Sequence, residues 1–235
     1  MQNGKPVAVV AGAGPGNGAA LARRFVEAGY AVALLARGRD ALAAFESEIA
    51  GTRGYPCDVG DAASVERAFA AIRSELGEVH TLLYNAGSGV FADVETITPE
   101  QFEQAWRVNA YGALLCAREV IPAMKARRSG NIIFIGATAS RRGGIKSAAF
   151  APAKAAQRSL AESMARKLWP EGVHVALIII DGIVDLPQTR KAMPERPDDA
   201  FVDPAGVAEI AYQLCRQDRR GWSFEVEARP YRETW

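Results

Sequence analysis

The glycines near the start of the chain have the spacing of a phosphate-binding turn. Gly12, Gly16 and Gly18 follow a short apolar run, Gly14 lies between them, and residues 19–28 carry apolar side chains at helical spacing. Glycine permits positive φ and lets the main chain approach a ligand without a Cβ in the way. The helix N-terminus that follows offers unpaired N–H groups and a partial positive charge. The pattern predicts a pyrophosphate site, although a plain glycine turn remains the alternative for this motif alone.

Residues that could contact a nucleotide follow each of the next three apolar runs. They are Arg37, then Asp58 with Val59, then Asn85 with Ala86 and Gly87. In a parallel sheet, ligands bind outside the carboxyl ends of the strands, at the point where the strand order reverses. We therefore expect these residues and the glycine turn to line one crevice.

The elements that must hold these residues alternate along the chain. Apolar runs predict strands over 7–11, 30–36, 52–57, 79–84, 131–136, 173–180 and 222–226. Helical patterns with caps predict helices over 19–28, up to about 50, and over 62–76, 99–127, 148–168 and 205–217. This alternation is typical of an α/β fold: a doubly wound parallel sheet of about seven strands with helices on both faces, in a single domain.

Composition narrows the class of protein. The 235 residues are 49% apolar and 23% charged with a net charge of +1, so we expect a soluble protein with no nucleic-acid or membrane partner. No signal segment precedes the first strand, which favours a cytoplasmic location. Cys57, Cys116 and Cys215 lack metal spacing, so we expect packed thiols and no metal site. His80 and His174 lie in or beside apolar strands and are expected to be structural.

Five features in register resemble the short-chain dehydrogenase/reductase family over nearly the whole chain. They are the glycine turn, Asp58-Val59, Asn85-Ala86-Gly87, Asn109 in the helix after the fourth strand, and Lys154 in the long helix after the fifth strand. The resemblance implies one Rossmann-type NAD(P)-binding domain spanning 1–235 and an oxidoreductase activity.

The resemblance also implies roles for the cofactor-binding residues. The three spaced glycines would cradle the pyrophosphate, Asp58 with Val59 would contact the adenine, and Asn85 and Gly87 would shape the floor under the cofactor. Asp58 could instead be a turn residue at the strand end.

Further roles follow for residues near the nicotinamide. Lys154 would hold the ribose hydroxyls, and Asn109 would anchor a water molecule in the proton relay. Lys154 could instead be a solvated helix lysine, and Asn109 could instead bond only to its neighbours in the helix. Asp181-Gly182 replaces the usual Pro-Gly after the sixth strand, where the carboxylate could bind the carboxamide or the substrate, or only cap the turn.

Two catalytic positions depart from the family pattern. The family has a Tyr four residues before the Lys and a Ser thirteen residues before that Tyr. This chain has Phe150 and Ala137 at those positions. Phenylalanine has no proton to give, and general acid–base help is worth roughly 10²–10⁴-fold in rate. Ordinary ketone–alcohol interconversion by the usual four residues is therefore not expected.

Other hydroxyl groups could take part. Thr138 or Ser140 could turn a hydroxyl into the site, and Ser147 lies three residues before Phe150, but none has a pKa near that of Tyr. Tyr84 is expected to pack at its strand end. A substrate that needs little acid help, such as an activated C=C bond, also fits this arrangement.

The end of the second strand indicates the choice of cofactor. NAD-dependent members of the family usually place an acid there, whereas this chain has Ala36 followed by Arg37, with Arg39 nearby. A guanidinium can pair with a 2′-phosphate that an acid would repel. We expect NADP(H) to be preferred over NAD(H), with Arg37 as the main contact; a merely solvated Arg37 is the alternative.

Two hypotheses for function follow. The first is an NADP(H)-dependent oxidoreductase with an atypical proton-donor arrangement, an unknown small carbonyl or enoyl substrate, and a mobile flap over about 184–204. The second is a non-catalytic NADP(H)-binding sensor or partner-binding protein.

The tail over 222–231 and the Phe-x-x-x-Lys pattern resemble a bacterial-type branch of the family. The family resemblance further implies a homodimer or homotetramer that packs through the helices of Asn109 and Lys154.

Overall fold

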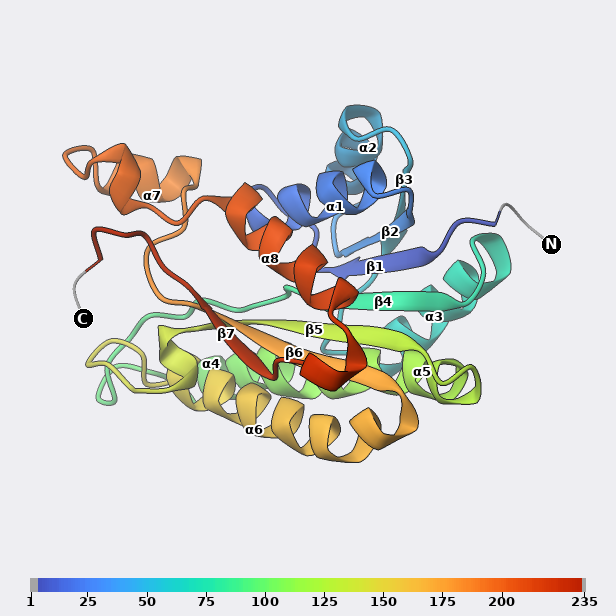
Figure 1. Ribbon diagram of the computed structural model, residues 1–235. Helices are drawn as coiled ribbons and strands as arrows, with labels where there is room; N and C mark the ends of the chain where they lie inside the picture. The colour runs from blue at the N-terminus through green and yellow to red at the C-terminus, as the bar shows by residue number, and fades with distance from the viewer. Residues whose placement is uncertain (1–3, 234–235) are drawn as a thin grey trace.

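Seven parallel strands form one sheet in the order β3-β2-β1-β4-β5-β6-β7 within residues 4–233, which are the residues that the computed structural model describes (Figure 1). The strands are β1 (Val7–Ala11), β2 (Ala31–Ala36), β3 (Thr52–Pro56), β4 (Val79–Tyr84), β5 (Gly130–Ala137), β6 (Val173–Ile180) and β7 (Glu225–Ala228). The order reverses between β1 and β4, so the carboxyl ends of these two strands mark the expected crevice. The predicted single-domain Rossmann-type α/β fold is confirmed.

Helices cover both faces of the sheet (Figure 1). One face carries α1 (Asn17–Glu27), α2 (Arg39–Glu48) and α8 (Pro204–Arg216). The other carries α3 (Ala62–Glu75), α5 (Gly112–Ala126) and α6 (Phe150–Leu168), with α4 (Pro99–Trp106) beside α6. Burial on both faces explains why the central strands are mostly apolar; all residues of β1 and β6 are buried.

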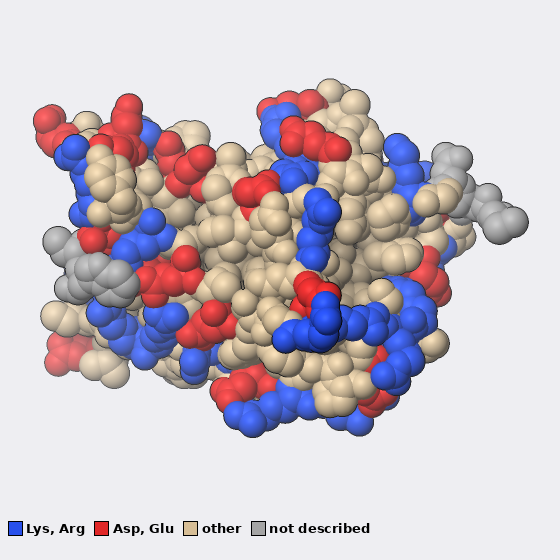
Figure 2. All heavy atoms as spheres, in the orientation of Figure 1, with Lys and Arg blue, Asp and Glu red and all other residues tan. Residues whose placement is uncertain are grey.

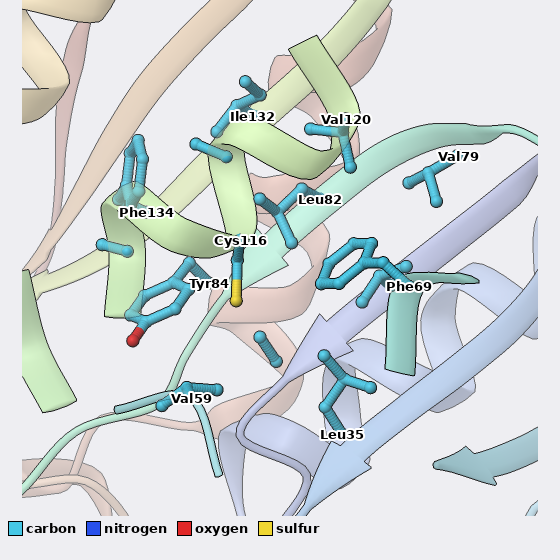
Figure 3. Packing of buried hydrophobic residues seen from close by; sticks show 14 of the residues in the cluster. Leu35, Val59, Phe69, Val79, Leu82, Tyr84, Cys116, Val120, Ile132 and Phe134 are labelled. Carbon is cyan, nitrogen blue, oxygen red and sulfur yellow. The ribbon is translucent and has the colours of Figure 1, made fainter. Parts of the chain in front are cut away.

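The larger part of the core lies between the sheet and the α3–α5–α6 layer. Figure 3 shows Tyr84 and Leu82 of β4 directed toward Cys116 of α5 and Phe69 of α3. The Cys116 thiol is fully buried, and burial raises its pKa well above the ordinary value. Cys57 is also buried and unpaired, so the predicted packing of these two thiols is confirmed.

The long helix predicted over 99–127 is not continuous. It begins with the expected capping box, in which Gln101 N donates to Thr98 Oγ1 at 3.2 Å and Thr98 N donates to Gln101 Oε1 at 3.1 Å. A π-helical turn over Arg107–Tyr111 then separates α4 from α5. Asn109 lies in this turn and is fully buried. Such π-turns occur frequently at functional sites.

The last strand begins three residues later than the predicted 222–226. The Trp222 ring instead stacks on His174, with centroids 4.7 Å apart, and packs against Trp169. Both ring nitrogens of His174 contact main-chain carbonyls, at 3.1 and 2.9 Å. His174 lies at the amino end of β6, away from the crevice, which confirms the structural role expected for it.

The segment expected as a flap has regular structure. It contains α7 (Pro187–Ala192), a 3₁₀ turn over Asp198–Ala200, and a bridge that pairs Val184 with Val202. Arg190 of α7 forms ion pairs with Asp185, which precedes this helix, and with Asp198, which follows it. In Figure 1, α7 lies beyond the carboxyl end of the sheet, near α8.

The surface agrees with the near-neutral charge. On the face shown in Figure 2, acidic and basic side chains are interspersed. Within residues 4–233, no helix combines the length and apolarity that a membrane crossing requires. Within the same residues, there is no group of three or more His, Cys, Asp or Glu side chains that could hold a metal ion.

Candidate functional site

A cavity of about 900 Å³ opens at the carboxyl ends of β1, β2, β3 and β4. Seven of the predicted cofactor residues line it: Gly12, Arg37, Asp58, Val59, Asn85, Ala86 and Gly87. Gln104 and Ser88 also line it and were not expected from the sequence. This volume is in the range of small-molecule and cofactor sites. The cavity thus brings together the seven predicted residues from four separate stretches of chain, as the sheet order requires.

The glycine turn is held against the end of β4. Gly12 has φ +94°, and a Cβ on it would lie 2.4 Å from Ala86 N. Asn85 Nδ2 donates to the Gly12 carbonyl at 2.8 Å, and a Cβ on Gly18 would lie 2.8 Å from the same oxygen. Glycine is therefore required at 12 and 18 by close approach of main chains. A Cβ on Gly14 would meet no heavy atom within 4 Å, so this position is not constrained in the same way.

The N-terminus of α1 is open to a ligand. Gly16 forms its N-cap with φ +85°, and no side chain caps the first turn. A Cβ on Gly16 would lie 2.1 Å from Leu186 Cδ2. Leu186, from the segment expected as a flap, thus lies directly over the glycine turn. Its contact with Gly16 was not predictable from spacing.

Arg37 and Asp58 lie at the entrance of the cavity. Arg37 is exposed and forms no ion pair with another residue of the described range 4–233. Asp58 Oδ1 accepts a hydrogen bond from Gly60 N at 2.9 Å. The turn role of Asp58, which the sequence left as the alternative, is therefore present, and the carboxylate also lines the cavity.

Lys154 and Asn109 meet beneath Gly87. Lys154 is 5% exposed, and Nζ donates to the Ile135 carbonyl at 2.8 Å and to Gln157 Oε1 at 3.2 Å. Burial lowers the pKa of Lys154 to about 7. Asn109 Oδ1 is buried without a hydrogen-bond partner among the described residues. A Cβ on Gly87 would lie 3.4 Å from Asn109 Oδ1 and 3.9 Å from Lys154 Nζ, so both groups lie close behind the cavity wall.

These observations fit a bound dinucleotide. The glycine turn leaves a cradle at the uncapped α1 N-terminus that suits a pyrophosphate. An orphaned buried amide oxygen is unusual in a folded protein and indicates a missing donor such as water or a ligand hydroxyl. Lys154, placed beside it, could donate to hydroxyl oxygens.

Phe150, at one of the two positions that lack hydroxyls, forms an apolar wall with Phe91. The Phe150 ring packs 5.5 Å from that of Phe91, and its centroid lies 5.9 Å from Lys154 Nζ. Phe91 is 67% exposed, so the wall reaches the surface. Ala137 ends β5, and its main-chain N donates to Ser140 Oγ at 3.1 Å. The site can therefore pack an apolar group but presents no ionisable hydroxyl at these positions.

The other hydroxyl groups named from the sequence have structural partners. Ser140 Oγ is the acceptor just described, and Ser147 Oγ bonds within its own turn. Tyr84 donates to a main-chain carbonyl of the π-helical turn at 2.5 Å, and burial raises its pKa. Tyr84 thus packs at its strand end as expected.

Thr138 and Asp181 belong to a largely buried polar cluster at the ends of β5 and β6. Thr138 Oγ1 donates to Asp181 Oδ1 at 2.5 Å, and Arg229 forms an ion pair with the other carboxylate oxygen. A Cβ on the adjacent Gly182 would lie 2.8 Å from Pro230 Cδ, so the segment after β7 packs tightly there. The cluster offers a structural role for Asp181 beyond the turn cap considered from the sequence.

We expect Arg229→Met to destabilise the protein by about 3 kcal/mol, because breaking a buried pair leaves the other charge uncompensated. The Arg229 and Asp181 side chains are only 13% and 11% exposed. Urea unfolding measures the change. Arg220→Met, in the exposed Arg220–Asp218 pair, should cost less than about 1 kcal/mol. Equal costs for the two substitutions would contradict the assignment of a buried pair.

Comparison with known proteins agrees with this geometry. The family model described as short chain dehydrogenase matches residues 6–197. The 3-oxoacyl-[acyl-carrier-protein] reductase MabA of Mycobacterium bovis is 32% identical over 219 residues, covering 89% of this chain and 85% of the relative. A short-chain dehydrogenase structure from Rhodopseudomonas palustris is 33% identical with a TM-score of 0.82, covering 96% of this chain and 99% of that one. A metagenomic short-chain oxidoreductase in complex with NADP is 28% identical with a TM-score of 0.83, covering 97% and 98%. The chain therefore belongs to the short-chain dehydrogenase/reductase family of oxidoreductases.

Proposed function

We propose that this protein is an NADP(H)-dependent oxidoreductase of an atypical branch, in which Phe150 and Ala137 replace the usual Tyr and Ser. The observation that carries the proposal is the glycine-lined cavity with the unpaired Arg37 at its entrance. The NADP-bound relative supports the cofactor type. When bound, the dinucleotide supplies or accepts a hydride.

The chain's own residues would divide the work between them. Gly12, Gly16 and Gly18 form the pyrophosphate cradle, and Arg37 pairs with the 2′-phosphate. Asp58 with Val59 borders the adenine, while Asn85, Ala86 and Gly87 form the floor. Lys154 and Asn109 provide the donors and the acceptor for the ribose side, near Asp181 and Gly182.

The substrate side is apolar. The Phe91–Phe150 wall favours a small apolar carbonyl or enoyl compound, since no hydroxyl near it has a suitable pKa for protonating an alkoxide. An activated C=C bond, whose reduction can take its proton from water, fits this wall best. We propose a homodimer or homotetramer in the cytoplasm, with the 184–204 segment closing over the glycine turn through Leu186.

A calorimetric titration with NADPH and NADH in parallel tests the cofactor. We expect micromolar NADPH binding, about −8 kcal/mol, and much weaker NADH binding. Binding of neither dinucleotide would contradict the proposal. Transfer of deuteride from stereospecifically labelled NADPH to enoyl and carbonyl compounds then tests for turnover.

A non-catalytic NADP(H) sensor is the second candidate, because the side chains at both catalytic positions, Phe150 and Ala137, lack a hydroxyl group. It predicts tight NADPH binding with no deuteride transfer to any compound. Stereospecific transfer to one substrate would exclude it.

The double variant Phe150→Tyr with Ala137→Ser should gain carbonyl reduction of at least about 10²-fold over the parent, because it restores an ionisable hydroxyl beside Lys154. The NADPH-dependent reduction of a panel of small apolar ketones measures the gain. Phe150→Leu with Ala137→Ser is the control and should show none. No gain in the Tyr variant would mean that the pocket differs in more than these two side chains.

A further inference from the structure

Gln157 is a fully buried polar side chain, one helical turn after Lys154 on α6. Its Oε1 accepts from Lys154 Nζ at 3.2 Å, and its Nε2 donates to the main-chain carbonyl of Asn109 at 2.8 Å. Only this orientation of the amide satisfies both neighbours, because an ammonium group is purely a donor and a carbonyl purely an acceptor. Gln157 therefore links Lys154 of α6 to Asn109 of the π-helical turn, the two site residues that this chain shares with the family pattern.

The direct link between Lys154 Nζ and the Asn109 main-chain carbonyl is a side-chain amide. The family resemblance assigns a relay water to Asn109. Here the main-chain carbonyl of Asn109 accepts from the Gln157 amide, while the side-chain oxygen Asn109 Oδ1 has no partner among the described residues. A water molecule can pass a proton from a donor to an acceptor, whereas an amide N–H does not ionise near neutral pH and so cannot relay one.

We propose that Gln157 is a positioning residue that fixes Lys154 Nζ behind Gly87 and keeps water out of the space between Nζ and the Asn109 main-chain carbonyl. Lys154 then acts as a fixed donor to the ligand. This proposal deepens the proposed function and rests on it for the identity of the ligand.

The surroundings of Lys154 make its charge sensitive to this contact. Burial is the cause of its lowered pKa, with no contribution from a charged side chain. The elements packed against it present the Ile135 carbonyl from β5, the Asn109 amide from the π-helical turn and the Gln157 amide from α6. The ionisable groups at the ends of the neighbouring strands β4 and β6 have other partners: Tyr84 donates to the Val108 carbonyl, and Asp181 bonds Thr138 and Arg229.

The test uses the free protein with ¹⁵N-labelled lysine, so that NMR follows the titration of Nζ and the exchange of its protons with water. Gln157→Met keeps the size of the side chain and removes both bonds; we expect the Lys154 midpoint to fall by about one pH unit. Gln157→Glu keeps the acceptor and adds a charge; we expect the midpoint to rise by about one pH unit. Gln157→Ala leaves room for water; we expect Nζ proton exchange to become at least about tenfold faster.

Gln213→Ala, which removes an amide bonded to Glu209 on the exposed side of α8, is the control and should change neither quantity. Unchanged midpoints in the Met and Glu variants, or unchanged exchange in the Ala variant, would overturn the proposal even if these variants lost stability. NADPH titration of the wild-type protein is a separate measurement. Its failure would remove the proposed function, while the lysine titration would still decide the role of Gln157.

Discussion

Gly12→Ala should abolish measurable NADPH binding and lower the free energy of unfolding by about 2–5 kcal/mol. The Cβ would lie 2.4 Å from Ala86 N and 2.5 Å from Ala86 Cα, and these are main-chain atoms that cannot rotate away. Positive φ adds about 1–2 kcal/mol for a residue with a Cβ, and overpacking costs about 1–3 kcal/mol more. Relief requires the ends of β1 and β4 to separate, which moves the turn and opens the floor of the cavity.

Gly14→Ala is the matched comparison within the same turn. A Cβ there meets no heavy atom within 4 Å, and its φ is not positive, so the free energy of unfolding should change by less than about 0.5 kcal/mol. The main-chain N–H groups of the turn remain in place. Urea unfolding and calorimetry with NADPH on both variants separate the two effects. Similar destabilisation by the two substitutions would contradict the steric argument.

The arrangement of the sheet could be predicted because its signal is local. Each central strand is a mostly apolar run between turn residues, since burial on both faces leaves no polar position in β1 and only His174 in β6. The edge strand β7 lacks this signal; it reads Glu-Val-Glu-Ala, and the apolar Trp222 before it packs on His174 instead of pairing. The sequence therefore placed the strand three residues too early.

The cavity could be predicted for the same reason, whereas the contacts behind it could not. Residues that follow successive strands must meet at one edge of a parallel sheet, so Asp58 and Asn85 were identifiable from position alone. The π-helical turn has no apolar signature, because it changes the hydrogen-bond register without changing which side chains are buried. Gln157 carried one available signal, a polar residue at i+3 from Lys154 on a buried helix face, but its bond to Asn109 spans 48 residues.

The Asp181–Arg229 pair also depends on distant parts of the chain. The carboxylate after β6 was expected to face the cofactor or the turn, but its partner comes from the segment after β7. The order of strands brings β6 and β7 side by side, so the pair follows from the fold rather than from any motif. Predicting it requires the register of an edge strand, which is the least certain element of the sequence pattern.

Arg37→Ala should remove the preference for NADPH while leaving NADH binding unchanged. Arg37 is exposed at the entrance of the cavity, beside Ala36 and Gly38 at the end of β2, where no acid stands to accept bonds from ribose hydroxyls. A hydrogen bond to a charged group contributes about 1.5–3 kcal/mol, which corresponds to a roughly 10–100-fold weaker NADPH complex. Parallel calorimetric titrations with the two dinucleotides measure the ratio of affinities.

Arg39→Ala provides the control, because Arg39 begins α2 and does not line the cavity. It should leave the ratio of NADPH to NADH affinity within about twofold of the wild-type value, since solvent and salt screen an exposed charge outside the cavity. Arg37→Glu should go further and favour NADH, because a carboxylate repels the 2′-phosphate and can accept bonds from ribose hydroxyls. An unchanged ratio in Arg37→Ala would assign Arg37 to solvent and leave NADP(H) preference without a residue to explain it. The ratio, and not the absolute affinity, is therefore the quantity that decides whether the end of β2 selects the cofactor.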